Sequence, residues 1–199
     1  MVKARIAVLV SGGGTNLQAL IDAQQSGIIK SGEITLVISN KKDAYALNRA
    51  EKAGIKTAVI EKNGDQVRFE ADIIKALNEN KTDIIVLAGF MCILSGDFTA
   101  KYENRILNVH PSLIPSFCGE GFYGLRVHKA ALDYGVKVTG ATVHFVNEIP
   151  DGGKIILQKA VAIEENDTPE ILQKRVMEQA EWKILPEAVE LVSKNYTKE

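Results

Sequence analysis

Hydrophobic residues along the chain follow two alternating spacings. Short, uninterrupted apolar runs rich in β-branched residues predict buried strands, and segments with an apolar period near 3.6 predict helices between them. Strands are expected at Ile6–Val10, Ile34–Ser39, Lys56–Ile60, Ile84–Ala88 and Ile106–Val109, and helices at Ala44–Ala53 and Val67–Asn80. Strands that are apolar throughout and alternate with helices are typical of a parallel sheet covered on both faces. The pattern therefore predicts an α/β fold built on an open, mostly parallel sheet.

The pattern changes after Pro111. The stretch VTGATVHFVNE alternates as a strand with one covered face does, and DGGKIILQKAVAI follows behind a Gly-Gly turn, so the two predict an antiparallel hairpin. The stretch NDTPEILQKRV then predicts a final long helix, with Thr168 as the N-cap, Pro169 at the first helical position and an acid in the first turn. Pro186 falls inside or beside the later part of this helix.

Composition narrows the class of protein. The chain has 199 residues, of which 46% are hydrophobic and 25% charged, as expected for a soluble globular protein with one full core. Its net charge of -1 creates no global field for nucleic acid or an anionic membrane. Its two cysteines, Cys92 and Cys118, form neither a disulfide scaffold nor a zinc motif. Without a signal-peptide pattern or a long apolar segment, we expect a single cytoplasmic domain over 1–199, with no nucleic-acid or membrane partner.

Three consecutive glycines, Gly12–Gly14, link the first strand to a segment with helical spacing. Such a loop lets backbone N–H groups and the positive end of the helix dipole approach a ligand, typically a phosphate. A tight turn without a ligand is the alternative. A dinucleotide loop would need glycine where Leu17 stands, and a triphosphate loop would need a lysine that is absent here. The loop therefore favours a monophosphate, with Thr15 and Asn16 as further donors.

A second polar feature is the stretch RILNVHPSLIP. Asn108 and His110 are two residues apart on an apolar strand, so they share one face at its carboxyl end, where open α/β sheets bind ligands. An amide donor beside an imidazole suits acyl transfer, because both groups can stabilise an oxyanion and the imidazole can move protons. A purely structural His-Pro strand end is the alternative. Asp151 is the best candidate to orient His110, although an aspartate before two glycines is also ordinary turn chemistry.

The other two histidines have less distinctive surroundings. His128 falls on an expected helix, either at the surface or in helix packing, and His144 lies within the alternating strand as a partly buried histidine with satisfied hydrogen bonds. A metal-dependent hydrolase could use His110, His144 and Asp151, but no close histidine spacing supports it. We therefore expect no metal.

Five stretches taken together resemble one family closely. VLVSGGGTNLQAL, VLAGFMCILS, LNVHPSLIPSF, GATVHFVNEIPDGGKIILQ and AEWKILPEAV resemble phosphoribosylglycinamide formyltransferase, in order, from about Ala4 to Leu191. The resemblance implies transfer of the formyl group of 10-formyltetrahydrofolate, as co-substrate, to the amino group of glycinamide ribonucleotide in purine synthesis, by direct attack and without a metal. It also implies a Rossmann-like, phosphoribosyl-binding half over 1–110 and a folate-cleft half over 111–199.

The same resemblance implies roles for individual residues. Asn108, His110 and Asp151 match the catalytic residues, and His144 matches a supporting histidine. The residues implied for the ribose phosphate are Ser11, Gly12, Gly13, Gly14, Thr15 and Asn16, with Glu181 for the ribose hydroxyls. Those implied for the folate are Arg68, Phe90, Met91, Cys92, Ile93, Leu94, Val146, Asn147 and Glu148, together with Asn108 and Asp151. The resemblance further implies a cis peptide bond at Ile114–Pro115.

Four departures from the family pattern bear on substrate affinity. Cys92 stands where many relatives have arginine, and Trp182 where histidine is frequent. Glu178 lies near a position where relatives offer the nucleotide a neutral or basic group, and the loop over 116–127 is longer than usual. Rival interpretations are methionyl-tRNA formyltransferase and formyltetrahydrofolate deformylase, which normally carry a further domain. A non-catalytic phosphosugar-binding module is another, in which only the glycine loop would matter. We expect small-molecule substrates and a monomer or weak homodimer.

Overall fold

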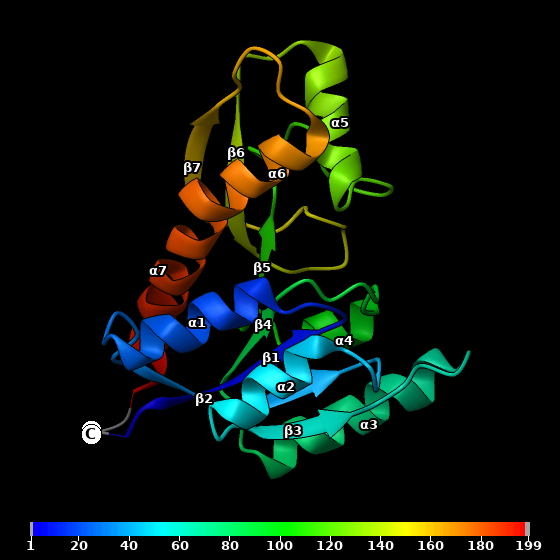
Figure 1. Cartoon of the computed structure of the whole chain (residues 1–199). Coiled ribbons are helices and arrows are strands. Elements are labelled where there is room, and N and C mark those ends of the chain that lie inside the picture. The colour runs from blue at the N-terminus through cyan, green and yellow to red at the C-terminus, as the bar shows by residue number, and fades with distance from the viewer. Residues whose placement is uncertain (1, 198–199) are drawn as a thin grey trace.

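The computed structural model describes residues 2–197 and contains one seven-stranded sheet (Figure 1). The strands lie in the order β3-β2-β1-β4-β5-β6-β7. Their bounds are β1 Ala4–Val10, β2 Gly32–Ser39, β3 Lys56–Val59, β4 Ile84–Leu87, β5 Ile106–His110, β6 Val138–Phe145 and β7 Ile155–Ala162. Strands β1 to β5 pair in parallel, and β6 and β7 pair antiparallel. The predicted fold class is confirmed, including the C-terminal hairpin.

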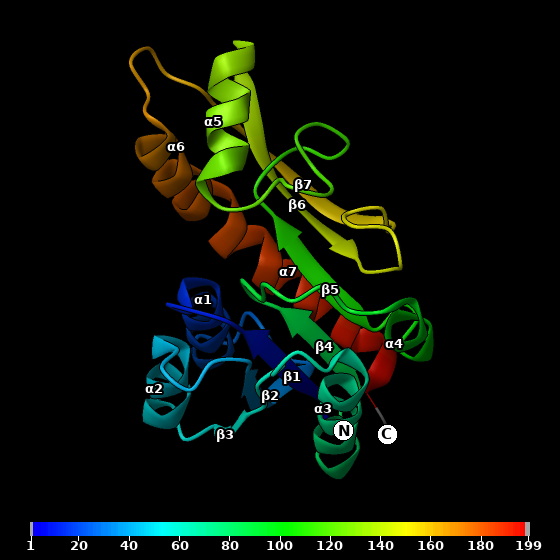
Figure 2. The same ribbon diagram turned by 90° about the vertical axis from the view of Figure 1, so that its right-hand side faces the viewer.

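Helices cover both faces of this sheet. Figure 2 shows α1 (Thr15–Gln25) and α2 (Tyr45–Lys52) on one side of the strands, and α3 (Gln66–Glu79) and α4 (Gly96–Lys101) on the other. The core is accordingly divided into two apolar clusters. One packs α1, α2 and the C-terminal helices against the sheet, and the other packs Phe69, Ile73 and Leu77 of α3 and Phe98 of α4 against the opposite face. This two-sided burial explains why β4 and the second half of β1 are continuous apolar runs in the sequence.

The predicted final helix extends from Pro169 to Ser193 but contains an interruption. It consists of α6 (Pro169–Val176), a π-helical turn at Met177–Glu181 and α7 (Trp182–Ser193), and Lys194–Tyr196 add a 3-10 turn. Thr168 is the N-cap as predicted, since its side chain accepts a hydrogen bond from the Ile171 N–H at 3.3 Å. Pro186 lies inside α7. The π turn has a local consequence, because it carries Glu181 to a buried position facing α1.

Most predicted element bounds differ from the observed ones by one or two residues. β2 begins at Gly32 rather than Ile34, and β5 extends to His110 rather than ending at Val109. Helix α4 was not predicted, because its six residues span less than two turns. Its start is nevertheless clear in the structure, where the Ser95 side chain caps the Phe98 N–H at 3.2 Å. Helix α5 (Leu125–Tyr134) carries His128 as expected.

Two glycines permit close backbone contacts in the C-terminal hairpin. A Cβ atom on Gly140 of β6 would lie 2.0 Å from the Lys159 carbonyl oxygen of β7, and one on Gly153 would clash with the Phe145 carbonyl. These contacts fix the pairing of β6 with β7 and the course of the loop between them, which carries Asp151. None of the helices within residues 2–197 is both long and apolar enough to cross a membrane.

Candidate active site

In the glycine loop at the carboxyl end of β1, all three glycine carbonyl groups already accept hydrogen bonds from within the protein. The Gly12 carbonyl accepts from the Ala46 N–H at 3.0 Å, the Gly13 carbonyl from Arg49 Nε at 2.8 Å, and the Gly14 carbonyl from the Gln18 N–H at 2.9 Å. Because a peptide carbonyl and the following N–H point in opposite directions, this arrangement presents N–H groups on the other side. The loop is therefore a donor-rich surface suited to an anion.

Helix α1 begins at this loop without a side-chain cap. Its N-cap, Gly14, has φ +72°, and a Cβ atom there would lie 2.6 Å from Ala46 Cβ, so glycine is required both by conformation and by contact. Around the Cα atoms of Gly12 and Gly13, in contrast, a Cβ atom would meet nothing within 4 Å. An uncapped helix N-terminus beside open space is the geometry in which proteins bind phosphate and carboxylate groups.

Arg49 of α2 is a candidate residue that the sequence did not reveal. Its guanidinium donates to the Gly13 carbonyl from Nε and to Gln18 Oε1 at 3.0 Å from Nη1, so a positive charge lies directly beside the loop. An arginine in the last turn of a helix is common, because its charge is stabilised by the negative end of the helix dipole. Its position in the sequence therefore does not indicate a role in a binding site. Only the tertiary contact identifies it.

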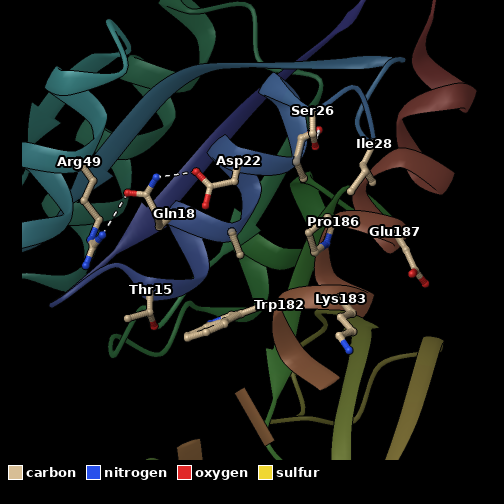
Figure 3. Close-up of a pocket in the computed structure, with 12 residues that line it drawn as sticks. Thr15, Gln18, Asp22, Ser26, Ile28, Arg49, Trp182, Lys183, Pro186 and Glu187 are labelled. Carbon is tan, nitrogen blue, oxygen red and sulfur yellow. Dashed lines mark hydrogen bonds between the residues drawn. The ribbon is translucent and has the colours of Figure 1, made fainter. Parts of the chain in front are cut away.

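A cavity of about 560 Å³ adjoins the loop, between α1 and α7 (Figure 3). Thr15 and Trp182 lie at the end nearest the loop, while Ile28 and Pro186 line the far end, and Arg49 extends over Gln18. Its lining surface is largely apolar, although polar and charged side chains such as Asp22 and Lys183 also line it. The cavity is thus continuous with the donor-rich loop at Thr15 but differs from it in chemistry.

Asn16 and Glu181 form a buried polar pair behind the loop. Asn16 Nδ2 donates to Glu181 Oε2 at 2.9 Å, and only 6% of the Glu181 surface is exposed. Burial raises the pKa of Glu181, and the hydrogen bond from Asn16 opposes that rise in part. Asn16 Oδ1 is also buried but has no hydrogen-bond donor within residues 2–197. A buried acceptor without a donor, next to a buried carboxylate, suits a ligand that carries hydroxyl groups.

The second cluster lies at the carboxyl end of β5, where the structure brings Asp151 to His110 as predicted. The distance from His110 Nδ1 to Asp151 Oδ2 is 3.4 Å, and His110 is only 4% exposed. His110 Nε2 is 2.9 Å from the Phe117 carbonyl oxygen. Since a carbonyl only accepts, Nε2 carries the proton, and both nitrogens of the ring face acceptors.

His144 joins Asn108 to the same carboxylate. In the antiparallel register Asn108 of β5 lies opposite His144 of β6, and Asn108 Nδ2 is 3.2 Å from His144 Nε2. His144 Nδ1 donates to the Phe145 carbonyl at 2.8 Å, so in the neutral ring Nε2 accepts from Asn108. Asp151 Oδ1 lies 3.5 Å from the same Nε2. The four predicted side chains therefore form one connected network.

Burial and charge act against each other within this network. Burial lowers the pKa of His110 below its ordinary value, although the Asp151 carboxylate and the Phe117 carbonyl act to raise it. For Asp151, burial alone would raise the pKa, but the adjacent His144 ring, the His110 charge and the Gly119 N–H at 2.8 Å outweigh it, and the pKa is lowered. The carboxylate is therefore ionised at neutral pH and faces two imidazole rings.

The residues predicted for the folate, other than Asn108 and Asp151, lie in three places. The loop from Phe90 to Leu94 follows β4, and its Met91 N–H donates to Ser11 Oγ at 2.8 Å, which links it directly to the glycine loop. Val146 to Glu148 follow β6, and the Val146 N–H donates to the Ile106 carbonyl at 2.9 Å. Arg68 instead lines a polar hollow along α3, together with Asp65, Asp72 and Lys75. Cys92 accepts a hydrogen bond from Asn40 Nδ2 at 3.1 Å.

Two further sequence-derived expectations can be compared with the structure. The Ile114–Pro115 peptide bond is cis, as predicted. His128 is 1% exposed, which excludes a surface position and leaves helix packing as its role. Across residues 2–197, no three side chains of the histidine, cysteine, aspartate or glutamate type are arranged to hold a metal ion.

Comparison with known proteins supports the resemblance seen in the sequence. Residues 4–189 match the formyl transferase family. The chain is 46% identical to phosphoribosylglycinamide formyltransferase of Haemophilus influenzae, over 92% of this chain and 84% of that protein. It is also 50% identical to the trifunctional purine biosynthetic protein adenosine-3 of Bos taurus, over 96% of this chain. This chain spans only 18% of that longer relative.

Solved structures agree with the sequence comparison. The structure of glycinamide ribonucleotide transformylase 1 from Symbiobacterium toebii superimposes with a TM-score of 0.90 at 42% identity, covering 97% of this chain and 89% of that chain. Phosphoribosylglycinamide formyltransferase from Brucella melitensis gives a TM-score of 0.87 at 43% identity, covering 96% of each chain. Since the family match covers nearly the whole sequence and the fold agrees over the same length, the chain belongs to the formyl transferase family.

Proposed function

We propose that this protein transfers the formyl group of 10-formyltetrahydrofolate to the amino group of glycinamide ribonucleotide, as a phosphoribosylglycinamide formyltransferase of purine synthesis. The observation that carries the proposal is the network of Asn108, His110, His144 and Asp151 at the end of β5. It lies in the same sheet as a donor-rich phosphate loop after β1, and between them β4 ends in a loop whose Met91 N–H donates to Ser11 of the phosphate loop. An amine acceptor held by its phosphate and an acyl donor held beside Asn108 would meet at this network.

The glycine loop accounts for binding of the acceptor. The N–H groups between Gly12 and Asn16 would hold the phosphate, and the Arg49 charge would add to the dipole of α1. Asn16 Oδ1 and the Glu181 carboxyl would accept hydrogen bonds from the ribose hydroxyls, which would supply the donor that Asn16 Oδ1 lacks. Ser11 Oγ accepts from the Met91 N–H, which leaves its own O–H free to donate to the phosphate.

Asn108 is the residue best placed to stabilise the oxyanion. One N–H of its side-chain amide donates to His144 Nε2, which fixes the plane of the amide and leaves the second N–H for the substrate. When an amine attacks a formyl carbon, negative charge develops on the formyl oxygen, and a pre-oriented donor stabilises it without further reorganisation. His144 therefore acts on Asn108 as a positioning residue.

His110 and Asp151 account for the movement of protons. The carboxylate favours the protonated ring, which can stabilise the oxyanion, and the neutral ring can accept a proton from the attacking amine. The Phe117 carbonyl occupies His110 Nε2 in this structure, so the 112–124 loop must shift before Nε2 can reach a substrate. Phe117 itself has φ +49°, an unfavourable conformation for a bulky residue, which lowers the cost of that shift.

The two loops that flank this network suit a partly apolar, planar donor such as a folate. Phe90 and Met91 offer apolar surface on one loop, and Val146 to Glu148 offer backbone groups on the other. We assign the phosphoribosyl-binding part to residues 1–110 and the folate cleft to residues 111–199, with the loop after β4 shared between them. Arg68 is the weakest of the proposed folate residues, because it lies in the separate hollow along α3.

The test is an absorbance assay for the tetrahydrofolate product of a 10-formyl folate, with and without glycinamide ribonucleotide, repeated with EDTA. We expect turnover that requires the ribonucleotide and is insensitive to EDTA. In Asn108→Ala, the loss of one oxyanion donor should lower kcat by about 10²–10³-fold and leave ribonucleotide binding intact. Deformylation without an acceptor would indicate a hydrolase instead. Ribonucleotide binding without any turnover would leave only a phosphosugar-binding module.

A further inference from the structure

The loop Gly89–Ser95, one proposed wall of the folate cleft, is anchored in the core near its far end by Leu94, which is buried. Met91 is 56% exposed and Ile93 is 69% exposed, so neither of these side chains anchors the loop by burial. The first two turns of α3 also hold the loop. At one end of the loop, Phe90 stacks on Phe69 with ring centroids 6.4 Å apart and an interplanar angle of 10°. In the middle, the Ile93 carbonyl accepts from Gln66 Nε2 at 3.1 Å.

Glu70 of α3 holds the far end of the loop. Its Oε1 accepts from the Ser95 N–H at 2.7 Å and from Gln66 Nε2 at 2.5 Å, and its Oε2 accepts from Ser95 Oγ at 2.5 Å. Ser95 is also the N-cap of α4, so Glu70, by binding Ser95, fixes the point where the loop ends and α4 begins. We call Gln66, Glu70 and Ser95 the α3–loop cluster.

The chemistry of this cluster goes beyond simple packing. Glu70 is only 7% exposed, and a buried carboxylate is costly unless charge-assisted hydrogen bonds compensate it. Three donors do so here, from the loop and from Gln66. Because a carboxylate only accepts, it also fixes which way each donor points, and Gln66 is thereby oriented toward the Ile93 carbonyl. An apolar side chain could fill the same space but could not orient the loop.

We propose that Gln66 and Glu70 are positioning residues for the formyl donor, which hold the Gly89–Ser95 loop in its binding shape before the donor arrives. This inference rests on the proposed function. A loop already ordered in the free protein costs less conformational entropy on binding, so the cluster strengthens binding of the donor without touching it. The proposed ribonucleotide site lies on the loop after the neighbouring strand β1, and we expect the cluster to affect it only through the Met91–Ser11 hydrogen bond.

The experiment compares Glu70→Gln, Gln66→Ala and Ser95→Ala with the wild type. Glu70→Gln keeps the size of the side chain but turns one acceptor into a donor that faces other donors. The matched control is Glu79→Gln, the same change at an exposed position in the last turn of α3. We expect KM for the 10-formyl folate to rise about tenfold in the cluster variants, with kcat and KM for the ribonucleotide within about twofold of wild type. The control should match the wild type throughout.

Two measurements test the role of the cluster independently of whether the protein transfers a formyl group. The dissociation constant for tetrahydrofolate and the amide hydrogen exchange of Met91 to Ile93 need no turnover. A weaker affinity for tetrahydrofolate and faster exchange in this loop, with unchanged exchange in α1, support the inference even if no formyl transfer occurs. An unchanged folate KM and dissociation constant in all three variants would overturn it, as would an equal loss of both substrates' binding, or a wild type that binds no tetrahydrofolate.

Discussion

Replacing His128 should make the protein more resistant to acid. This histidine lies on α5 with 1% of its surface exposed, and neither ring nitrogen has a hydrogen-bond partner within the described residues. Burial, together with the nearby His110 charge, lowers its pKa from 6.5 to about 4. The unfolded chain binds a proton near pH 6.5, whereas the native ring resists it until about pH 4. The contribution of the neutral ring to the free energy of unfolding is therefore fully present above pH 6.5 and is lost as the pH falls toward 4.

The structure sets the size of this effect. The difference between a pKa of 6.5 and one of about 4 corresponds to at most about 3 kcal/mol. Because the full loss is reached only below about pH 4, we expect a loss of about 2 kcal/mol down to about pH 4.5. His128→Leu removes the proton-binding group and also the two unpaired buried nitrogens. Removing these nitrogens should raise the free energy of unfolding by about 1 kcal/mol at neutral pH. His128→Gln removes the titration alone and keeps a polar side chain at the same position.

Urea unfolding of the three proteins at about pH 7.5 and about pH 4.5 provides the test. Between these two pH values the free energy of unfolding of the wild type should fall by about 2 kcal/mol more than that of either variant. At the higher pH only His128→Leu should be more stable than the wild type. Other groups that respond to acid, such as Asp151 and Asp167, are common to all three proteins and cancel in the comparison. Equal losses in all three proteins would refute the claim that the buried ring is held neutral.

Two further changes test the hairpin and the catalytic network. In Gly140→Ala the new methyl group would meet the Lys159 carbonyl at 2.0 Å and a Leu113 methyl at 2.9 Å, so the free energy of unfolding should fall by about 3 kcal/mol; chemical denaturation measures this, and a loss under about 1 kcal/mol would contradict the close approach. In Asp151→Asn the charge that raises the pKa of His110 disappears, so the imidazole should titrate at lower pH by NMR; an unchanged or higher pKa would show that the carboxylate does not act on the ring.

Local periodicity explains how much of the fold could be predicted. The central parallel strands are largely apolar because both of their faces are covered, and the change to alternation after Pro111 marks the hairpin. The capping residues Thr168 and Pro169 placed the start of α6 correctly. Helix α4 escaped prediction because six residues carry too little periodicity. The π turn at Met177–Glu181 also escaped, since it depends on how α6 and α7 pack rather than on local sequence.

Residue spacing alone establishes proximity within the candidate site only where one element supplies two of its residues. Asn108 and His110 share a face of β5 because side chains on a strand alternate, so their proximity follows from the sequence. Arg49 and Gly13 are 36 residues apart, and nothing local connects them. The burial of His128 and the contact between Glu70 and Ser95 likewise depend on tertiary packing. Such contacts become visible only when the helices are placed against the sheet.

Asp151 shows how two interpretations of one residue can both hold. The sequence left open whether it serves the turn before Gly152 or orients His110. In the structure it has φ +56°, a conformation that aspartate and asparagine tolerate better than most residues, and the turn places its carboxylate against both histidines. Its Oδ2 also accepts from the Gly119 N–H, which joins the 112–124 loop to the network. Asparagine would preserve the turn and retain an acceptor for Gly119 but would lack the charge. A changed His110 pKa in Asp151→Asn would therefore result from the lost carboxylate charge and not from a change in the conformation of the loop.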